Sequence, residues 1–358
     1  MNVLYDHQAF SMQKFGGISR YFYELINHLD SDISYKLPIY FSNNFYIQNK
    51  DVSNHRCFFP SKDFKGKSKI LGLINNYSIN KWAKTSIDIV HPTYYEPYFL
   101  RKIKNTPFVL TVYDMIHEKY SNYFKKSDPA IVYKKTLCEK ASKIIAISEN
   151  TKKDLVELFN INPEKITVIY LGQSFDANLT NGMTLPEQYV LFTGQRAGYK
   201  NFNRFIEAYS KIAIKNDIEL ICTGRPFSEE ELSLLRQLQI EKRVTHFLAN
   251  DLQLAELYRR SRLFVFPSEY EGFGIPILEA FASGCPIALS QASSFPEIAG
   301  DAGLYFDPLS VDSIKDTMQK ALRSDTLRRE LVERGFSQLS KFSWKKMGEE
   351  TSKLYKSI

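Results

Sequence analysis

Two carboxylates, Glu271 and Glu279, stand eight residues apart in the stretch 268–286, which reads S-E-Y-E-G-F-G-I-P-I-L-E-A-F-A-S-G-C-P. Gly272 and Gly274 separate the two acids and permit a tight turn with close backbone approach, and the residues that follow suit a short helix. Free backbone N–H groups at a helix N-terminus favour an anion by roughly 0.3–1 kcal/mol. The stretch therefore predicts an anion-binding site flanked by two carboxylates that can accept hydrogen bonds from hydroxyl groups. This combination suits a sugar nucleotide.

A pair of basic residues, Arg196 and Lys200, lies in the segment G-Q-R-A-G-Y-K-N, directly after the apolar run 189–193. An arginine offers a planar fork to phosphate oxygens, and a lysine offers a point charge. Because both follow the carboxyl end of a predicted strand, they are expected to neutralise a leaving diphosphate.

Gly16 and Gly17 stand between a short apolar start at 2–5 and an apolar stripe of helical spacing that runs from Ile18 to Leu29. A strand, a glycine loop and a helix together bring backbone N–H groups close to a phosphate. The pattern is weak by itself, and it is not the G-x-G-x-x-G dinucleotide fingerprint.

Strands and helices alternate through both halves of the chain, which predicts parallel sheets with helices on both faces. The strand-like runs are 2–5, 87–91, 108–112, 144–147, 166–170, 189–193, 219–223, 244–248, 263–266, 287–289 and 304–306. In such sheets ligands bind at the carboxyl ends of the strands, where the charged pairs above fall. The polar stretch 172–185 contains two glycines and is typical of an interdomain connection.

The G-x-R-x-x-x-K-N segment, followed by E-x(7)-E inside E-G-F-G-I-P-I-L-E-A, resembles the retaining glycosyltransferases of family four. The resemblance covers nearly the whole chain, including I-I-A-I-S-E-N-T-K-K-D-L from Ile144 and the tail F-S-W-K-K-M from Phe342. It implies an α/β fold of the GT-B type, with two facing Rossmann-like domains, a cleft between them and a C-terminal helix that crosses back to the first domain. The implied boundaries are 1–172 plus 343–358 for the acceptor-side domain, 186–342 for the nucleotide-sugar domain and 173–185 for the linker.

The resemblance also implies roles for the matching positions. Glu271 would hold the donor sugar near the reacting centre as a catalytic residue, and Glu279 would bind the nucleotide ribose. Phe247 and Leu248 would meet the base. The diphosphate would be held by charged side chains and backbone N–H groups, namely those of Gly16, Gly17, Arg196, Lys200, Gly274 and Ile275.

The chain departs from the family pattern at one position of the first domain. Many members carry a histidine directly after the strand that here ends L-T-V, whereas this sequence continues with Tyr113 and Asp114, and His117 follows. Tyr113 could supply a hydroxyl, Asp114 could fix a sugar, and His117 could take over the polar contact. Asp114 and His117 are therefore predicted as catalytic candidates, and the spacing does not rank the three.

The reaction implied by the resemblance is transfer of a hexose from a nucleoside diphosphate to an acceptor hydroxyl, with retention at the anomeric carbon. No metal-ligand spacing or cofactor fingerprint occurs in the sequence, so no metal and no cofactor are expected. By family frequency the first donor is GDP-mannose and the acceptor is a glycan or lipid-linked glycan in O-antigen, capsule or lipopolysaccharide synthesis. UDP- or dTDP-hexoses are the alternative donors, and a catalytically silent sugar-nucleotide-binding protein is the alternative class.

Composition and charge limit the location and the partners. The 358 residues, 44% hydrophobic and 24% charged, suit a folded protein of two domains without a signal peptide or an apolar run of membrane-spanning length, and four scattered cysteines favour a reducing cytoplasm. Residues 1–172 hold 24 Lys and Arg against 16 Asp and Glu, and lysines gather between 101 and 153. The sequence therefore predicts a cytoplasmic enzyme, and no recognised motif points to nucleic acid. Three interpretations of the basic face of the first domain stay open: an ordinary solvated surface, contact with anionic lipid at the inner face of the membrane, or contact with an acidic acceptor.

Overall fold

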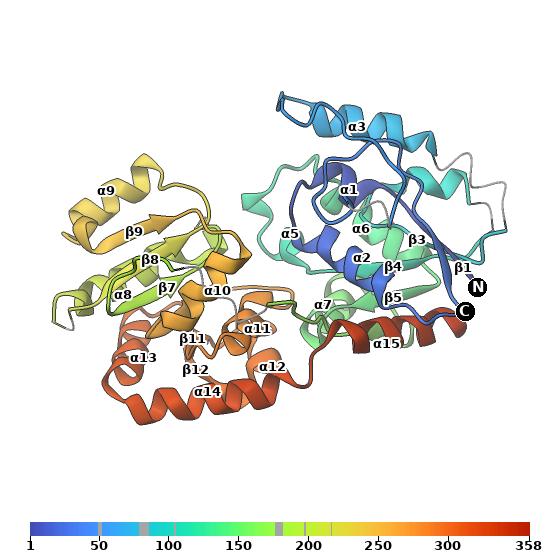
Figure 1. Cartoon of the computed structure of the whole chain (residues 1–358). Coiled ribbons are helices and arrows are strands. Elements are labelled where there is room, and N and C mark those ends of the chain that lie inside the picture. Colours follow the sequence, from blue (N-terminus) through green and yellow to red (C-terminus); the bar gives the residue numbers. More distant parts are fainter. Residues whose placement is uncertain (49–51, 79–85, 104, 176–181, 197, 216) are drawn as a thin grey trace. The chain divides into compact units, whose positions relative to one another are not determined.

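A computed structural model describes the chain except residues 49–51, 79–85, 104, 176–181, 197 and 216. The chain forms two compact units (Figure 1): unit 1 comprises Met1–Leu171 and Ser343–Ile358, and unit 2 comprises Gly172–Phe342. The predicted linker 173–185 includes residues 176–181, which lie outside the described part.

Unit 1 contains two three-stranded parallel sheets, in the orders β2-β1-β3 and β4-β5-β6. Their strands are β1 (Asn2–Tyr5), β2 (Ser34–Lys36), β3 (Ile89–His91), β4 (Val109–Val112), β5 (Lys143–Ala146) and β6 (Ile166–Val168). A parallel bridge between Val90 and Phe108 joins β3 to the region just before β4. The strands therefore place the ends of β1, β3 and β4 along a common carboxyl edge.

The helices of unit 1 that the structure describes ahead of unit 2 pack on these sheets and on one another. They are α1 (Gln8–Met12), α2 (Gly17–Asn27), α3 (Lys67–Asn76), α5 (Ile116–Lys119), α6 (Pro129–Lys140) and α7 (Glu149–Phe159), with 3-10 turns η1 (Pro97–Arg101), η2 (Ser121–Tyr123) and η3 (Pro163–Lys165). In α2 the predicted stripe is buried, and Tyr21, Phe22 and Leu25 are at most 1% exposed. The helical spacing of the apolar residues therefore predicted this helix correctly.

Helix α15 (Trp344–Lys356) belongs to unit 1 although all of unit 2 precedes it in the chain. It lies against α2 (Figure 1), and Gly348 comes so close that an added Cβ would stand 2.1 Å from the carbonyl oxygen of His28. At its last turn Tyr355 shares hydrogen bonds with Tyr5 (Oη–Oη, 3.0 Å) and His91 (Oη–Nδ1, 2.6 Å), and His91 Nε2 is 2.9 Å from Thr111 Oγ1. This buried polar chain fixes α15 on the strands of unit 1.

Unit 2 is built on one six-stranded parallel sheet with the order β12-β11-β10-β7-β8-β9. Its strands are β7 (Tyr189–Phe192), β8 (Glu219–Thr223), β9 (Val244–Phe247), β10 (Leu263–Phe266), β11 (Ile287–Ser290) and β12 (Gly303–Phe306). The helices are α8 (Phe202–Ala213), α9 (Glu229–Gln237), α10 (Asp251–Arg260), α11 (Ile275–Ala282), α12 (Phe295–Ala299), α13 (Val311–Arg323) and α14 (Asp325–Leu339), with 3-10 turns η4 (Gly198–Lys200), η5 (Glu241–Arg243) and η6 (Gly300–Ala302). The alternating pattern thus correctly predicted doubly wound parallel sheets.

Strand β7 is the first strand of unit 2, and the chain builds the sheet outward from it in both directions. After β7 come β8 and β9 on one side, and the chain then returns to place β10 on the other side. The carboxyl ends of β7 and β10 therefore form a topological switch point, where loops diverge and ligands bind in open α/β sheets. Among the described residues, none of the helices is long and apolar enough to cross a bilayer.

Candidate active site

The loops that follow β7 and β10 lie side by side at the switch point of unit 2. The backbone N–H of Glu269, after β10, donates to the carbonyl of Tyr199, after β7, at 2.8 Å. Arg204 of α8 adds an ion pair to the Glu269 carboxylate at 2.6 Å. These contacts hold the two loops at a fixed spacing.

Lys200 and Glu271 meet across these loops. The Lys200 Nζ–Glu271 Oε1 distance is 2.5 Å, and the two side chains are 20% and 16% exposed. Sequence reasoning placed both residues at strand ends, and the structure brings them together as an ion pair. A carboxylate beside an ammonium group at a partly open position can accept hydroxyl hydrogen bonds while the cation faces a phosphate.

The turn that carries Glu271 is held by two serines before α12. Ser293 Oγ accepts from the Glu271 N–H (3.1 Å) and donates to the Glu271 carbonyl (2.5 Å), and Ser294 Oγ lies 2.9 Å from the Phe273 carbonyl. Gly274 ends the turn with φ at +101°, and an added Cβ would stand 3.0 Å from Ile277 Cδ1. The position therefore favours glycine, because the backbone conformation is one that other residues rarely adopt and the space beside it is tight.

Helix α11 begins directly after this turn, and few of its first N–H groups are available to an anion. Pro276 has no N–H, and the Ile277 N–H donates to the Gly274 carbonyl at 2.9 Å. In the described structure this leaves the N–H groups of Gly274 and Ile275 as the donors of the turn. These are two of the six positions that the sequence predicted for the diphosphate.

Glu279 lies one turn into α11 and contacts a tyrosine of α10. Tyr258 Oη lies 3.4 Å from Glu279 Oε2 and 3.1 Å from Thr193 Oγ1 at the end of β7. Burial raises the pKa of the Tyr258 phenol well above its ordinary value, and the Glu279 carboxylate adds to this shift. The tyrosine therefore stays protonated and fixes the carboxylate near the switch point, a contact that sequence reasoning missed.

Arg196 does not have the placement predicted for a diphosphate ligand. Its side chain is fully buried and lies with its guanidinium carbon 4.6 Å from the centre of the Phe227 ring. The guanidinium donates to protein acceptors: Glu231 Oε1 (3.3 Å), Thr223 O (3.1 Å), Pro226 O (2.9 Å) and Arg225 O. Because this fork is already occupied, Arg196 ties β7 to the loop after β8 instead of facing a ligand.

The residues predicted to meet the base lie two strands away from β7, at the end of β9. Phe247 is the last residue of that strand and is partly buried, whereas the next residue, Leu248, is 82% exposed. Contact with a base stays a prediction for both.

In unit 1 the Gly16-Gly17 loop opens α2, but a neighbouring side chain fills the helix start. Gln13 Oε1 accepts from the Ser19 N–H at 3.1 Å, and it lies 2.4 Å from where a Cβ on Gly16 would stand. Gly16 itself has extended backbone, whereas Gly17 has open space around it. The Gln13 amide oxygen therefore takes the Ser19 N–H at the start of α2, which no local pattern in the sequence signalled, and phosphate contact by Gly16 and Gly17 stays a prediction.

The three residues after β4 differ in how much they are buried. The Tyr113 hydroxyl is buried and, among the described residues, has no hydrogen-bond partner. Asp114 Oδ1 accepts from the Ile116 N–H at 3.0 Å and so forms an Asx turn just before α5. His117 lies between two carboxylates, with Nδ1 4.0 Å from Asp114 and Nε2 3.9 Å from Asp128. Burial lowers its pKa and the nearby Lys134 ammonium adds to this, so the ring is neutral at pH 7.

Lys134 of α6 is bonded to the segment 114–118 that follows β4. Its side chain is 1% exposed, and its Nζ donates to Glu118 Oε2 (2.9 Å) and to the Asp114 carbonyl (3.1 Å). The ammonium also lies 5.5 Å from the centre of the Tyr95 ring. The sequence counted this lysine among the exposed basic cluster, and the structure corrects that assignment.

A buried acid at the end of β1 was also missed. Asp6 is 1% exposed and accepts hydrogen bonds from the Thr93 N–H (2.8 Å), the Thr93 hydroxyl (2.6 Å) and Gln8 Nε2 (2.6 Å). Its position directly after the first strand was the only available signal. The network orders the loops at the carboxyl edge of unit 1.

Two family descriptions match the chain, one in each half. "Glycosyltransferase Family 4" matches residues 15–174, and "Glycosyl transferases group 1" matches residues 181–338. Within the described residues, no group of three or more His, Cys, Asp or Glu side chains is arranged to hold a metal ion.

Curated relatives and solved structures extend the comparison. The chain is 30% identical over 283 residues to O-antigen chain mannosyltransferase B of Escherichia coli, covering 74% of this chain and 73% of the relative. It is 30% identical over 225 residues to the serotype-specific mannosyltransferase WbdA of Escherichia coli, spanning 28% of that protein's length. Anabaena HepE, solved in complex with UDP and glucose, superposes with a TM-score of 0.76 at 17% identity, covering all of both chains.

Proposed function

The chain belongs to glycosyltransferase family 4 and has the GT-B fold, and we propose that it transfers mannose from GDP-mannose, with retention, to a hydroxyl of a glycan or lipid-linked acceptor. The pathway would be the synthesis of O-antigen or a related surface polysaccharide at the inner face of the membrane. The mannosyltransferase names of the relatives in Escherichia coli support this choice of sugar.

The observation that carries the proposal is the Lys200–Glu271 ion pair at the switch point of unit 2. Departure of a nucleoside diphosphate needs fixed positive charge near the leaving oxygens, and Lys200 supplies it. The Gly274 and Ile275 N–H groups supply neutral donors beside it. Glu271 accepts hydroxyl hydrogen bonds from the sugar and lies where positive charge develops at the anomeric carbon.

The remaining assignments follow from position. Glu279, held by Tyr258, accepts from the ribose hydroxyls. Among the described residues, none of the contacts of Glu271 joins it to a second carboxylate of the kind that could act as a nucleophile. This favours attack by the acceptor hydroxyl on the face of the sugar from which the diphosphate leaves. The departing phosphate would take the proton of that hydroxyl. On unit 1, Asp114 and the neutral His117 are assigned to acceptor or donor hydroxyls.

The proposed reaction is tested with Glu271→Gln and a short soluble glycan acceptor. Transfer from GDP-mannose should fall by roughly ten- to a hundredfold, because a hydrogen bond to a charged group contributes about 1.5–3 kcal/mol and about 1.4 kcal/mol is a factor of ten. Glu269→Gln is the control for the loss of a loop contact alone, since Glu269 lies two residues away with a similar exposed fraction, 21%, and pairs with Arg204; it should lower transfer less than Glu271→Gln does. Unchanged transfer by Glu271→Gln would rule out the catalytic assignment.

Two readouts of the same assay test the finer claims. NMR of the glycoside product should show the anomeric configuration of the donor, and an inverted product would refute retention. Transfer should continue in excess EDTA, and loss of activity that added Mg²⁺ or Mn²⁺ restores would refute metal independence.

A UDP-hexose is the alternative donor, favoured by the complex of HepE with UDP and glucose. A thermal-shift series with GDP, UDP, dTDP and their hexose derivatives separates the two. The bound nucleotide stabilises the native fold and raises the melting temperature.

A further inference from the structure

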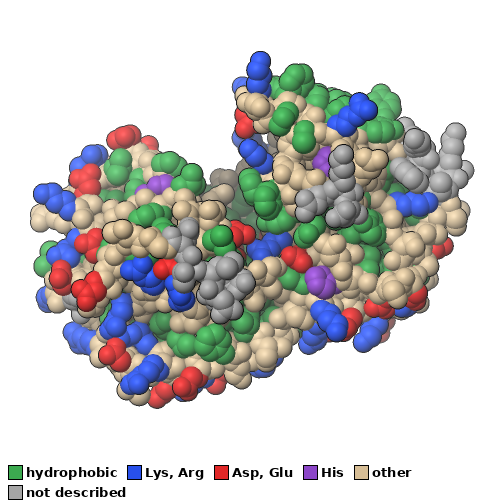
Figure 2. Space-filling model, viewed as in Figure 1, with side chains coloured by type: hydrophobic (Ala, Val, Ile, Leu, Met, Phe, Trp, Pro, Cys, Tyr) green, Lys and Arg blue, Asp and Glu red, His purple; other side chains and the backbone are tan. Residues whose placement is uncertain are grey.

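Unit 1 exposes several large apolar side chains in α3 and in the loop before it, mixed with lysines. We name it the α3 surface, and it consists of Phe59, Lys62, Phe64, Lys65, Lys69, Ile70, Leu73 and Tyr77. Figure 2 shows hydrophobic and basic side chains intermingled over the segment labelled α3 in Figure 1. Leu73 is 64% exposed and Tyr77 71%, and the gathering of several exposed apolar side chains in one segment, more than any single value, marks this surface.

The apolar exposure is built into a firmly anchored helix. Ile70, Leu73 and Tyr77 follow one another at i, i+3 and i+7, which places them on one face. The opposite side is buried: Leu71 is 3% exposed and Asn75 is fully buried. The Asn75 amide donates to Ser11 Oγ of α1 at 2.9 Å and to the Phe41 carbonyl at 2.8 Å, and its oxygen accepts from the Tyr40 N–H at 2.9 Å.

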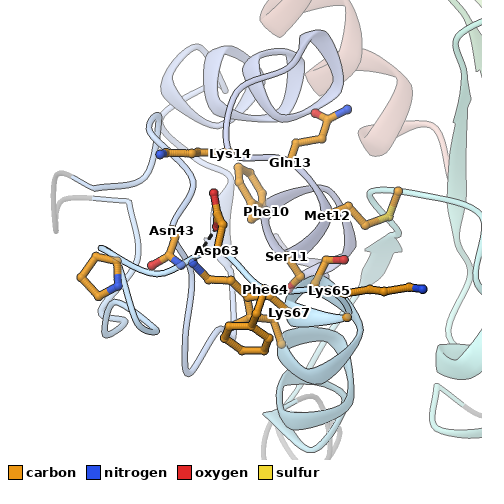
Figure 3. Close-up of a pocket in the computed structure, with 14 residues that line it drawn as sticks. Phe10, Ser11, Met12, Gln13, Lys14, Asn43, Asp63, Phe64, Lys65 and Lys67 are labelled. Atoms are coloured by element: carbon orange, nitrogen blue, oxygen red, sulfur yellow. Dashed lines mark hydrogen bonds and ion pairs between the residues drawn. The ribbon is translucent and has the colours of Figure 1, made fainter.

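The loop before α3 is held in place by one lysine. Lys67 Nζ donates to the carbonyls of Phe59 (3.0 Å) and Lys62 (2.7 Å) and to Asp63 Oδ1 (3.0 Å). Figure 3 shows the contact between Lys67 and Asp63 beside a cavity of about 450 Å³, which is lined by residues of α1, of α3 and of the loop before α3. These Lys67 contacts hold the loop that carries the exposed side chains of Phe59 and Phe64.

The charge of this region is one-sided. Between residues 56 and 77 the sequence holds five basic residues and one acid, Asp63, which Lys67 neutralises. In the described part of the chain the ammonium groups of Lys62, Lys65 and Lys69 make no ion pair. By contrast, the stretch 101–153 that the sequence favoured contains the buried Lys134–Glu118 pair and its own acids.

We infer that the α3 surface docks on a bilayer that contains anionic lipids. The apolar side chains enter the boundary between headgroups and acyl chains, and the lysines approach lipid phosphates, as in helices that lie in the plane of a membrane. The two features complement the two layers of one partner, a negatively charged lipid surface. The inference rests on the proposed function for its purpose, because a lipid-linked acceptor would be presented at that surface, but binding to vesicles needs no catalysis.

Vesicle flotation tests the inference with the whole protein. The vesicles are phosphatidylcholine alone and phosphatidylcholine with about one quarter phosphatidylglycerol. Binding should require the anionic lipid and weaken as salt rises. Lys65→Gln with Lys69→Gln should lower the partition coefficient by roughly twenty- to thirtyfold, because each lysine contributes about 1 kcal/mol at such a surface. Leu73→Glu should lower it by roughly tenfold or more.

Matched controls separate this surface from general effects. Leu309→Glu changes a leucine of nearly equal exposed fraction, 63%, in unit 2, and Lys125→Gln with Lys126→Gln removes two exposed lysines of the 101–153 stretch. Both controls should float like the unmodified protein. Equal losses in controls and α3 variants, or no binding of the unmodified protein to anionic vesicles, would overturn the inference.

A second assay keeps this inference apart from the proposed function. The α3 variants should retain transfer to a short soluble acceptor and lose it to an acceptor embedded in anionic vesicles. If the unmodified protein transfers no sugar to either acceptor while the α3 variants still lose flotation, the membrane surface stands and the proposed reaction fails. Loss of soluble transfer together with a lowered melting temperature in both α3 variants would instead identify α3 as a structural element and overturn the inference.

Discussion

Replacing Arg196 with methionine should destabilise unit 2 and leave donor affinity nearly unchanged. The guanidinium is fully buried and donates to Glu231 and to three backbone carbonyls. Methionine has a similar length but no donor, so the substitution leaves these acceptors without that partner.

The expected decrease in the free energy of unfolding follows from the contacts that remain in Arg196→Met. Removing one partner of a buried ion pair costs about 3–5 kcal/mol. Glu231 keeps Arg225 Nη2 at 2.8 Å and the Ser228 N–H at 2.8 Å, which favours the lower end, about 3 kcal/mol. For a domain of this size each kcal/mol shifts the melting temperature by about 2–4 °C, so a decrease of roughly 6–12 °C is expected.

The assay pairs thermal unfolding with titration of a nucleoside diphosphate below the melting temperature of the variant. The double variant Arg196→Met, Glu231→Met should recover part of the stability, because it removes the uncompensated carboxylate as well. Lys200→Met is the contrasting variant, and it should weaken nucleotide binding while costing less stability than Arg196→Met, since Lys200 and Glu271 are both partly exposed (20% and 16%).

The reverse result for Arg196 would refute this reasoning. If Arg196→Met melts within about 2 °C of the unmodified protein and binds the nucleotide more than tenfold more weakly, the guanidinium faces the ligand. The role predicted from the sequence would then be correct, and the buried placement would not describe the donor-bound state.

Two further predictions concern unit 1. Burial lowers the pKa of His91 to about 3, whereas the unfolded imidazole titrates near 6.5. The contribution of His91 to the free energy of unfolding should therefore be constant above pH 6.5 and fall as the pH drops from 6.5 toward 3. Between pH 7.5 and 5.5 the unmodified protein should lose about 1.4 kcal/mol more than His91→Asn does in urea unfolding. A pH-independent difference between the two proteins would contradict the buried neutral imidazole. Lys134→Met, which leaves Glu118 without its ammonium partner, should cost about 3 kcal/mol and lower sugar transfer more than nucleotide affinity, with the exposed Lys135→Met as control. Equal effects of the two substitutions would show that the buried ion pair does not order the segment after β4.

The sequence predicted the fold well because its evidence is local. Strand-like runs separated by helical stretches specify a doubly wound sheet, and the E-x(7)-E stretch carries its own glycine turn and helix start. Polar residues that directly follow a strand can be assigned to the carboxyl edge without knowing the strand order. Glu271 and Lys200 were found in this way, although their contact depends on β7 and β10 being neighbours.

The errors arose where a distant residue decides the placement of a side chain. Arg196 follows a strand as a phosphate ligand would, but its acceptor Glu231 is 35 residues further along. Gln13 fills the start of α2 through its side chain, which no motif records. Helix α3 was not predicted because its outward face is apolar, so it lacks the polar stripe by which surface helices are recognised.

The discontinuity of unit 1 has a consequence for its synthesis. A ribosome completes Met1–Leu171 and then makes the whole of unit 2 before it reaches α15. At about 5–20 residues per second, roughly ten to thirty seconds pass before Tyr355 can reach His91. During that interval the α2 face that α15 covers is exposed to solvent, and exposed apolar surface in an incomplete domain is what makes a folding chain prone to aggregation.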